Sequence, residues 1–287
     1  MEIVGIILAG GSGKRLQPST KVINKHLIPV YDKPMIYYPF STLMLLGIKN
    51  LIIVTSPNFK ESYEKLFGDG SNFGVKINYI IQKQPNGIPE VFLLCKNEIK
   101  NKKICLILGD NIFYGSNLKT ILTKNNFISG AEIFTYQVDD PSRYGIVEFS
   151  KNSSNINITE KPKATKSKNA ITGFYYFDDS ILNKVNKINF SRSGELEITD
   201  VLRLYQKEKR IKVNRLSRGI AWFDAGTNDS LYDATDFVKS IEKRQGLKIF
   251  CPEEIAWRNG WISDNRLNKL ASSYMQNSYG NYLGQLI

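Results

Sequence analysis

The feature that most constrains the fold is an apolar run near the N-terminus that ends in a cluster of glycines. The run Ile3–Leu8 is apolar on both faces, which is typical of a strand buried inside a parallel sheet. Gly10, Gly11 and Gly13 follow, and glycines let a backbone turn tightly and offer N–H groups to a phosphate. The spacing fits neither a Walker loop, GxxxxGK[ST], nor the dinucleotide pattern GxGxxG, in which Leu16 stands where the last glycine belongs. The turn is therefore either a phosphate-contacting loop of another kind or purely structural.

The first part of the chain alternates strand-like and helix-like segments. Further strands are expected at Leu51–Val54, Val75–Ile81 and Ile104–Leu108, and helices at Met35–Leu46, Phe59–Phe67 and from about Pro89. Such alternation predicts a parallel sheet with right-handed crossovers, in which ligands bind beyond the carboxyl ends of the strands. The glycine turn and Gly109-Asp110-Asn111 both follow strands, so we expect them at one edge of the sheet.

After about Ala131 the pattern changes to shorter, alternating runs, which predict mixed or antiparallel strands that extend the sheet. These strands are expected at Ile133–Val138, Tyr144–Phe149, Ile156–Glu160 and Ala170–Phe177, and helices at Thr199–Lys207, Asp229–Lys243, Glu253–Trp257 and Arg266–Tyr274. We predict an α/β fold with a Rossmann-like, mixed but mostly parallel central sheet flanked by helices. Residues 1–240 would form this core, and residues 241–287 a small helical C-terminal extension that is not an independent domain.

Composition argues against several other classes of protein. No apolar run reaches the roughly 18 residues of a membrane span, so we expect no membrane partner. Cys95, Cys105 and Cys251 form no CxxC pair and His26 is the single histidine, which argues against a zinc cluster. Free thiols suit a reducing compartment, which predicts a cytoplasmic protein. The net charge is +12, but the basic residues are scattered along the chain and do not form blocks. We therefore expect a positive cleft for phosphates and no nucleic-acid partner.

A series of short motifs connects the glycine turn to a known family. The turn reads LAGGSGKRLQPST, Lys25 opens KHLIP, and VYDKPMIYY follows. Further matches lie at residues 66–71, 109–115, 140–145, 160–163, 194–200, 221–224, 242–246 and 251–258. In this order the motifs resemble the nucleotidyltransferases that act on sugar 1-phosphates. The YDKPMIYYP wording is particularly close to the members that use dTTP and glucose 1-phosphate.

The resemblance implies a reaction and a metal. A nucleoside triphosphate and a sugar 1-phosphate would give a nucleotide sugar and pyrophosphate, by in-line attack of the sugar phosphate oxygen on the α-phosphorus. Both reactants are anions, so the protein has to position them and neutralise charge, and no general base is needed. Mg²⁺ takes hard oxygen ligands, and Asp110 and Asp224 match the family's two metal-binding aspartates.

The same match assigns three further groups of residues. The catalytic residues would be Arg15, Lys25, Asp110 and Lys161. The nucleotide-binding residues would be Gly10, Gly11, Gly13, Arg15, Gln82, Gly87 and Asp110, with Gln82 against the pyrimidine edge. The sugar-phosphate-binding residues would be Asn111, Gly145, Glu160, Lys161 and Thr172, followed by Gly173. Taken singly, Arg15 and Lys25 would also fit solvated surface charges, and Glu160 with Lys161 would fit an exposed charge pair.

Three departures from the family's wording touch the predicted pockets. The usual G-L-A-Q-A segment is here Gly87-Ile88-Pro89-Glu90-Val91, and a carboxylate that pointed toward the triphosphate would oppose its binding. His26 replaces the usual Gln, where it could keep a hydrogen bond and add charge at lower pH. The usual R-G-E-L-E begins with Ser193, and Arg192 stands one place earlier. The metal pair and the phosphate cations are intact, so we expect the chemistry to survive.

Three hypotheses remain open at this point. The chain makes dTDP-glucose; or it runs the same chemistry on another pyrimidine nucleotide or hexose 1-phosphate; or it is a weakly active relative that binds a nucleotide sugar as a regulatory subunit. The resemblance also implies a homo-oligomer, which is a tetramer in the family. It implies a regulatory nucleotide-sugar site to which Glu253–Trp261, Tyr114–Gly115 and Arg218–Gly219 would contribute.

Overall fold

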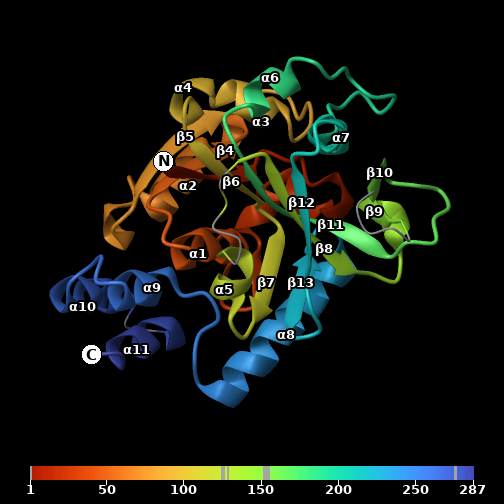
Figure 1. Ribbon diagram of the computed structural model, residues 1–287. Coiled ribbons are helices and arrows are strands. Elements are labelled where there is room, and N and C mark those ends of the chain that lie inside the picture. The colour runs from red at the N-terminus through yellow and green to blue at the C-terminus, as the bar shows by residue number, and fades with distance from the viewer. Residues whose placement is uncertain (1, 124–126, 128, 151–155, 275–276) are drawn as a thin grey trace.

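The core of the fold is a mixed sheet whose first strands run parallel (Figure 1). The computed structural model describes residues 2–123, 127, 129–150, 156–274 and 277–287. Its parallel strands lie in the order β5 (Lys76–Ile81), β4 (Asn50–Thr55), β1 (Ile3–Ala9) and β6 (Lys103–Leu108). The predicted parallel half of the sheet is confirmed.

The second half of the sheet is mixed and mostly antiparallel, in agreement with the mixed or antiparallel strands that were predicted. β11 (Asn169–Phe177) runs antiparallel to β6 and pairs with both β8 (Ala131–Gln137) and β9 (Gly145–Phe149). β10 (Ile156–Glu160) pairs with β9, and β12 (Ile211–Arg215) runs parallel to β8. The register between β8 and β11 shifts between Ile171 and Tyr175. The predicted mixed α/β class is confirmed.

Two small ribbons stand outside this sheet. β7 (Asn111–Gly115) pairs antiparallel with β13 (Ile220–Asp224), and β2 (Pro29–Val30) pairs with β3 (Lys33–Pro34). Neither β7 nor β13 is among the strands expected from the sequence. The β7–β13 ribbon matters for function because it carries polar residues from two distant parts of the chain to one place.

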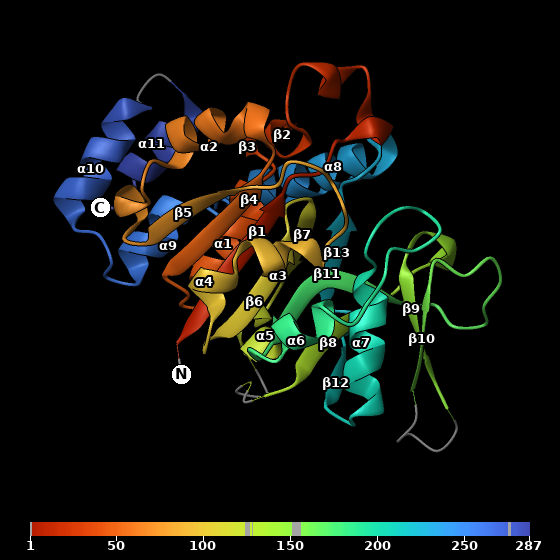
Figure 2. The same cartoon turned by 90° about the horizontal axis from the view of Figure 1, so that it is seen from above.

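Helices cover both faces of the sheet (Figures 1 and 2). Along β1, Val4 and Ile6 face one apolar cluster while Ile7 and Ala9 face the other, as the two-residue period of a strand requires. The first face packs against α3 (Glu90–Leu94), α4 (Lys96–Ile99), α6 (Ile181–Val185) and α7 (Ile198–Lys207). The second packs against α1 (Tyr37–Leu45), α2 (Lys60–Phe67) and α5 (Leu118–Thr123).

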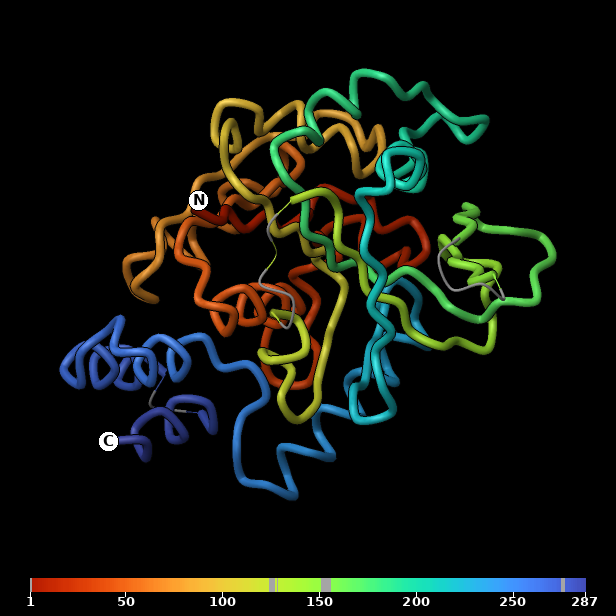
Figure 3. Tube along the Cα trace, in the orientation of Figure 1, coloured from red at the N-terminus to blue at the C-terminus, as the bar shows by residue number. Residues whose placement is uncertain are grey.

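The C-terminal part is helical, as predicted. α8 (Asn228–Gln245) begins with a capping box made by Thr227 and Ser230, and the left-handed Gly246 ends it, so the boundary expected at residue 240 falls inside this helix. α9 (Pro252–Arg258), α10 (Asp264–Ser273) and α11 (Ser278–Gly284) follow, and α9 packs against α1 (Figure 3). None of the helices in the described part of the chain has both the length and the apolar character needed to span a bilayer.

Candidate active site

The glycine turn leaves β1 at the carboxyl edge of the sheet and leads into a 3₁₀ helix, Lys14–Leu16. Gly13 is left-handed with φ 62°, and a Cβ on it would lie 2.8 Å from Thr20 Cγ2, so this position requires glycine. Nothing lies within 4 Å of the point where Gly11 would carry a Cβ, so this part of the turn is open. Asp110 follows β6, the parallel neighbour of β1, so the turn and this carboxylate share one edge, as predicted.

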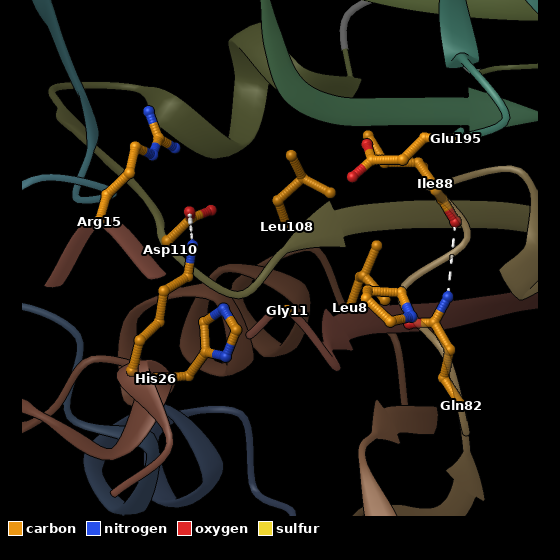
Figure 4. A pocket seen from close by; sticks show the side chains of 12 residues that line it. Leu8, Gly11, Arg15, His26, Gln82, Ile88, Leu108, Asp110 and Glu195 are labelled. Atoms are coloured by element: carbon orange, nitrogen blue, oxygen red, sulfur yellow. Dashed lines mark hydrogen bonds and ion pairs between the residues drawn. The ribbon is translucent and has the colours of Figure 1, made fainter. Parts of the chain in front are cut away.

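A first cleft lies along this edge (Figure 4). Gln82 and Glu195 lie at one end of it and Arg15 and Asp110 at the other. Its lining residues are Leu8, Gly11, Arg15, Lys25, His26, Gln82, Pro85, Gly87, Ile88, Leu108, Asp110 and Glu195. Most of the predicted nucleotide-binding residues are in this set. Gly10 and Gly13 are not, although a Cβ on Gly10 would come within 2.5 Å of Gln82 Oε1.

A second cleft adjoins the first. It is lined by Arg15, Ile88, Leu108, Asp110, Asn111, Arg143, Tyr144, Gly145, Glu160, Lys161, Ile171, Gly173, Tyr175, Ile198, Thr199, Trp222 and Asp224. The predicted sugar-phosphate residues lie here with one exception: Thr172 is buried and donates its hydroxyl to the Phe134 carbonyl, while Gly173 lines the cleft in its place. Arg15, Ile88, Leu108 and Asp110 line both clefts, so two ligands bound side by side would meet at Arg15 and Asp110.

The two predicted metal ligands are brought together by the β7–β13 ribbon. Asp224 pairs in register with Asn111, and the Ala225 N–H donates to the Asp110 carbonyl at 2.9 Å. Burial, together with the negative charge of Asp110, raises the pKa of Asp224 to about 6. Asp110 and Asp224 are therefore the residues of the site that could hold a divalent cation.

Lys25 supplies a positive charge beside one of these carboxylates. Its Nζ forms an ion pair with Asp110 Oδ2, and both side chains are largely buried. Burial opposes ionisation of Asp110, but the Lys25 charge and its hydrogen bond hold the pKa of that carboxyl well below its ordinary value. Asp110 is therefore a carboxylate at neutral pH and available to a metal.

His26 keeps a hydrogen bond but does not add charge. Its backbone N–H and its ring Nδ1 both donate to Asn24 Oδ1, at 2.9 Å and 2.8 Å. Burial, followed by the charge of Lys25, lowers the pKa of His26 to about 3. The expectation that His26 could add charge at lower pH is therefore not supported, because the ring is buried against Gly109.

The sugar side of the site rests on Glu160 and Lys161 at the end of β10. Glu160 accepts a hydrogen bond from Thr199 Oγ1 at 3.0 Å and pairs with Lys161 Nζ at 3.0 Å. Lys161 has a backbone φ of 36°, a conformation that costs energy in a non-glycine residue and is often found at binding sites. A Cβ on Gly145 would lie 2.8 Å from Thr199 Cγ2 and 3.4 Å from Glu160 Oε2, so glycine here leaves room for both side chains.

Asn111 joins the three strands around the second cleft. Its Oδ1 accepts hydrogen bonds from Gly173 N at 2.9 Å and from Trp222 Nε1 at 2.6 Å. Its Nδ2 donates to Asp110 Oδ1 at 3.0 Å. Asn111 thus fixes the position of one predicted metal ligand against β11 and β13, which is a structural reason for an amide at this point.

Arg143, for which the sequence predicts no role, lies on the rim of the second cleft. Its Nη2 is buried with no hydrogen-bond partner among the described residues, and it lies 3.8 Å from Asp224 Oδ2. A buried guanidinium nitrogen aimed at a cleft is suited to an anion. The motif DPSRYG at residues 140–145 contained the signal, but no role was assigned to its arginine.

The departure at Ser193 leaves the second cleft without an arginine from that segment. Arg192 is exposed and lines neither cleft. Ser193 Oγ is within 3.1 Å of Glu197 and 2.7 Å of Ser191, so it is engaged within its own loop. Cationic side chains therefore reach this cleft from Arg15, Arg143 and Lys161.

The donor set fits a hard divalent cation that is shared with phosphates. Among the residues that the structure describes, no group of three or more His, Cys, Asp and Glu side chains is arranged so that it could hold a metal ion. A pair of carboxylates is what Mg²⁺ usually takes from a protein when phosphates supply the remaining oxygens. Asp110 and Asp224 form such a pair.

Fold and site together define a class of enzyme that joins a nucleotide to a phosphorylated ligand. Residues 4–241 match the family model described as Nucleotidyl transferase, and the chain belongs to that family. Over nearly its full length it is similar to proteins named glucose-1-phosphate thymidylyltransferase. The one from Neisseria meningitidis is 46% identical over 99% of both chains, and that from Mycobacterium tuberculosis is 47% identical over 99% of this chain and 98% of its own.

Solved structures agree with this assignment. A crystal structure described as a glucose-1-phosphate thymidylyltransferase from Bacillus anthracis, in complex with sucrose, has a TM-score of 0.77 and 35% identity, covering 88% of this chain and 99% of that one. A UDP-glucose pyrophosphorylase complexed with UDP-glucose shares the fold, with a TM-score of 0.72 and 24% identity over 85% of this chain and all of that one. The resemblance found in the sequence motifs is confirmed.

Proposed function

We propose that this chain transfers a thymidylyl group from dTTP to glucose 1-phosphate, giving dTDP-glucose and pyrophosphate. The observation that carries the proposal is that the two clefts meet at Arg15 and Asp110. A nucleotide in the first cleft and a sugar phosphate in the second would bring the α-phosphorus and the attacking oxygen together at this junction. The names of the full-length relatives support the choice of dTTP and glucose 1-phosphate.

The roles of the charged residues follow from this arrangement. Arg15 would bind the departing pyrophosphate in a bidentate manner, and Lys25 would neutralise the triphosphate while keeping Asp110 ionised. Lys161 would bind the phosphate of the sugar, and Glu160 would accept hydrogen bonds from sugar hydroxyls. The phosphate nucleophile needs no base, which agrees with the buried, neutral His26 beside the cleft.

Asn111 and Gly145 would form the floor of the sugar pocket. Arg143 would add a second cation for the sugar phosphate, in the absence of an arginine at Ser193. Gln82 and Gly87 would contact the base at the far end of the first cleft, and Gly10, Gly11 and Gly13 would shape the turn beneath the phosphates.

Asp110 and Asp224 would hold Mg²⁺. When bound, the ion would neutralise charge on the phosphates and on the aspartate pair. The pair is well suited to it, because both carboxylates are largely buried and the charge of Asp110 disfavours the ionisation of Asp224.

Assembly, regulation and location are also proposals. We expect a homo-oligomer, a tetramer as in the family, with a separate nucleotide-sugar site. Tyr114–Gly115 and Arg218–Gly219, two segments assigned to that site, adjoin at the open end of the β7–β13 ribbon, where Gly115 pairs with Ile220. The buried free thiols of Cys95, Cys105 and Cys251 suit the cytoplasm.

The test is a steady-state comparison of substrate pairs. Pyrophosphate release is followed with Mg²⁺ and each of dTTP, UTP, dCTP and dATP, against glucose 1-phosphate, galactose 1-phosphate and mannose 1-phosphate. The proposal expects the highest kcat/KM for dTTP with glucose 1-phosphate and loss of activity with a chelator. A tenfold or greater preference for another pair would reassign the substrates. Tight nucleotide binding without turnover would instead identify a regulatory relative.

A further inference from the structure

Glu90, one of the departures from the family's wording, is hydrogen-bonded to the predicted base-contacting residue. Gln82 Nε2 donates to Glu90 Oε2 at 2.8 Å, and Asn86 Nδ2 donates to Glu90 Oε1 at 2.8 Å. Glu90 is partly buried at the start of α3 and is not among the residues that line the first cleft. The carboxylate is therefore directed at two amides rather than at the triphosphate.

This contact allows the side-chain amide of Gln82 only one orientation. A carboxylate only accepts hydrogen bonds, so Gln82 must turn its Nε2 toward Glu90. The same nitrogen lies 3.5 Å from the Gly87 carbonyl oxygen, which is a second acceptor for it. A Gln at position 90, as is usual in the family, could donate or accept and would permit either orientation.

The other end of the amide, Gln82 Oε1, then lies on the side of the glycine turn. Gln82 Oε1 accepts no hydrogen bond from any residue in the described part of the chain. It lies against the glycine turn, where a Cβ on Gly10 would come within 2.5 Å of it. Gln82 is buried at the end of the first cleft that would hold the nucleotide base, so the cleft has a fixed hydrogen-bond acceptor there.

We infer that Glu90 is a positioning residue that fixes Gln82 Oε1 as an acceptor, so that the cleft selects pyrimidines carrying an N3–H donor. Thymine and uracil have this hydrogen, whereas cytosine has a lone pair at N3 that would face the oxygen. The inference rests on the proposed function only in placing the base beside Gln82. It predicts discrimination by hydrogen-bond polarity, which is stronger than discrimination by a methyl group because a mismatched polar group is left unpaired.

The first test compares Glu90→Gln with wild type, using kcat/KM for dTTP, dUTP and dCTP with glucose 1-phosphate. The expected result is a fall of about tenfold in the dTTP-to-dCTP ratio, carried by KM, with kcat for dTTP little changed. The dTTP-to-dUTP ratio should stay the same, since both bases carry N3–H. Glu61→Gln, a matched change at an exposed residue of α2, should leave all ratios at the wild-type value. A dTTP-to-dCTP ratio in Glu90→Gln within twofold of wild type would overturn the inference.

The second test separates this inference from the proposed function and does not depend on the variant. Binding of dTTP, dCTP and N3-methyl-dTTP to the wild-type protein is measured by calorimetry with Mg²⁺ and without sugar phosphate. The inference expects dTTP to bind at least about tenfold more tightly than either of the others. Equal binding of dTTP and dCTP would overturn it. Selective binding without turnover in the presence of glucose 1-phosphate would support the inference while contradicting the proposed function.

Discussion

Asp224, the last residue of β13, lies beside Asp110, the residue that precedes β7, and burial together with the charge of Asp110 raises the pKa of Asp224 to about 6. The two residues arrive from distant parts of the chain and are locked together by the Ala225 N–H, which donates to the Asp110 carbonyl. The positive charge of Lys25 neutralises the negative charge of Asp110 in an ion pair. The arrangement places a second carboxylate, with Arg143 3.8 Å from it, at the meeting point of two clefts, where a metal and two phosphorylated ligands would gather.

Removing either carboxylate should cost activity without unfolding the protein. Asp110→Asn and Asp224→Asn should each lower kcat by about 100-fold or more, because a metal that neutralises phosphate charge is worth several kcal/mol in the transition state. In metal-free protein Asp224→Asn should not lower the thermal midpoint, since it removes a repulsion. Asp233→Asn, an exposed residue of α8, is the matched control and should be unchanged. Full activity in Asp110→Asn or Asp224→Asn would refute the role of that residue.

Arg143 should contribute to binding of the sugar phosphate. Its Nη2 is buried without a hydrogen-bond partner among the described residues, on the rim of the second cleft. Arg143→Met should raise KM for glucose 1-phosphate by about 10- to 100-fold, the range expected for a lost charge-assisted hydrogen bond, and change KM for dTTP less. Arg192→Met removes the same charge from an exposed residue outside both clefts and should have no effect. If Arg143→Met and Arg192→Met had the same KM for glucose 1-phosphate, Arg143 would have no role in binding the sugar phosphate.

Gly226 should be needed for the position of Arg15. A Cβ on Gly226 would lie 2.7 Å from Arg15 Nη2 and 3.0 Å from Asp224 Oδ1. The guanidinium is the far end of a flexible side chain, so Gly226→Ala should displace it while the fold persists. A displacement of about 1 Å can cost about 100-fold, so we expect kcat/KM for dTTP to fall 10- to 100-fold with an unchanged thermal midpoint. Gly284→Ala, with nothing within 4 Å of the new Cβ, is the control. Wild-type kinetics in Gly226→Ala would show that the contact does not position Arg15.

Asp178 should contribute stability that depends on pH. It accepts hydrogen bonds from the Gly130 N–H at 2.7 Å, from Ser180 Oγ at 2.5 Å and from Tyr205 Oη at 3.0 Å. Burial opposes its ionisation, but these bonds hold the pKa of Asp178 below its ordinary value. At pH 7, Asp178→Asn should lower the free energy of unfolding by about 2 kcal/mol.

The sign of the pH effect follows from the direction of that shift. A carboxyl whose folded pKa is depressed stabilises the fold fully above its unfolded pKa of about 3.9, and loses the effect as pH falls through the folded pKa. The difference between wild type and Asp178→Asn in urea unfolding should therefore shrink below about pH 4. A difference that stayed constant or grew on acidification would contradict this assignment.

The parallel half of the sheet could be predicted because its signal is local. Ile3–Leu8 and Ile104–Leu108 are apolar on both faces, and short runs of that kind bounded by glycine or polar residues fit buried strands. α7 could be predicted as well, since its buried residues at 198, 201, 202 and 205 repeat with the helical period. The same edge-of-sheet argument correctly placed the glycine turn beside Asp110.

The strands β7 and β13 could not be predicted from local pattern. Each has five residues, and each finds its partner only through a part of the chain about a hundred residues away. α11 was missed for a different reason: Gly280 and Gly284 lower its intrinsic helix propensity. Asn277 caps its N-terminus and Tyr279, Tyr282 and Leu283 are buried, so tertiary packing determines the helix.

The site residues could be proposed from the motifs, but their chemistry depended on neighbours. No sequence pattern indicated that the pKa of His26 would be lowered by burial, or that Glu90 would bond to Gln82. Arg143 could not be singled out from the sequence. Only the folded structure shows that its Nη2 is buried without a hydrogen-bond partner among the described residues.

The most direct test of the account is to follow an isotope through one complete reaction. Wild-type protein is given Mg²⁺, dTTP and glucose 1-phosphate carrying ¹⁸O in all its non-ester phosphate oxygens, and the products are analysed by ³¹P NMR and mass spectrometry. The account predicts equal amounts of dTDP-glucose and pyrophosphate, with all of the label in dTDP-glucose, because the sugar phosphate attacks the α-phosphorus. Absence of dTDP-glucose, or label in the pyrophosphate, would contradict it.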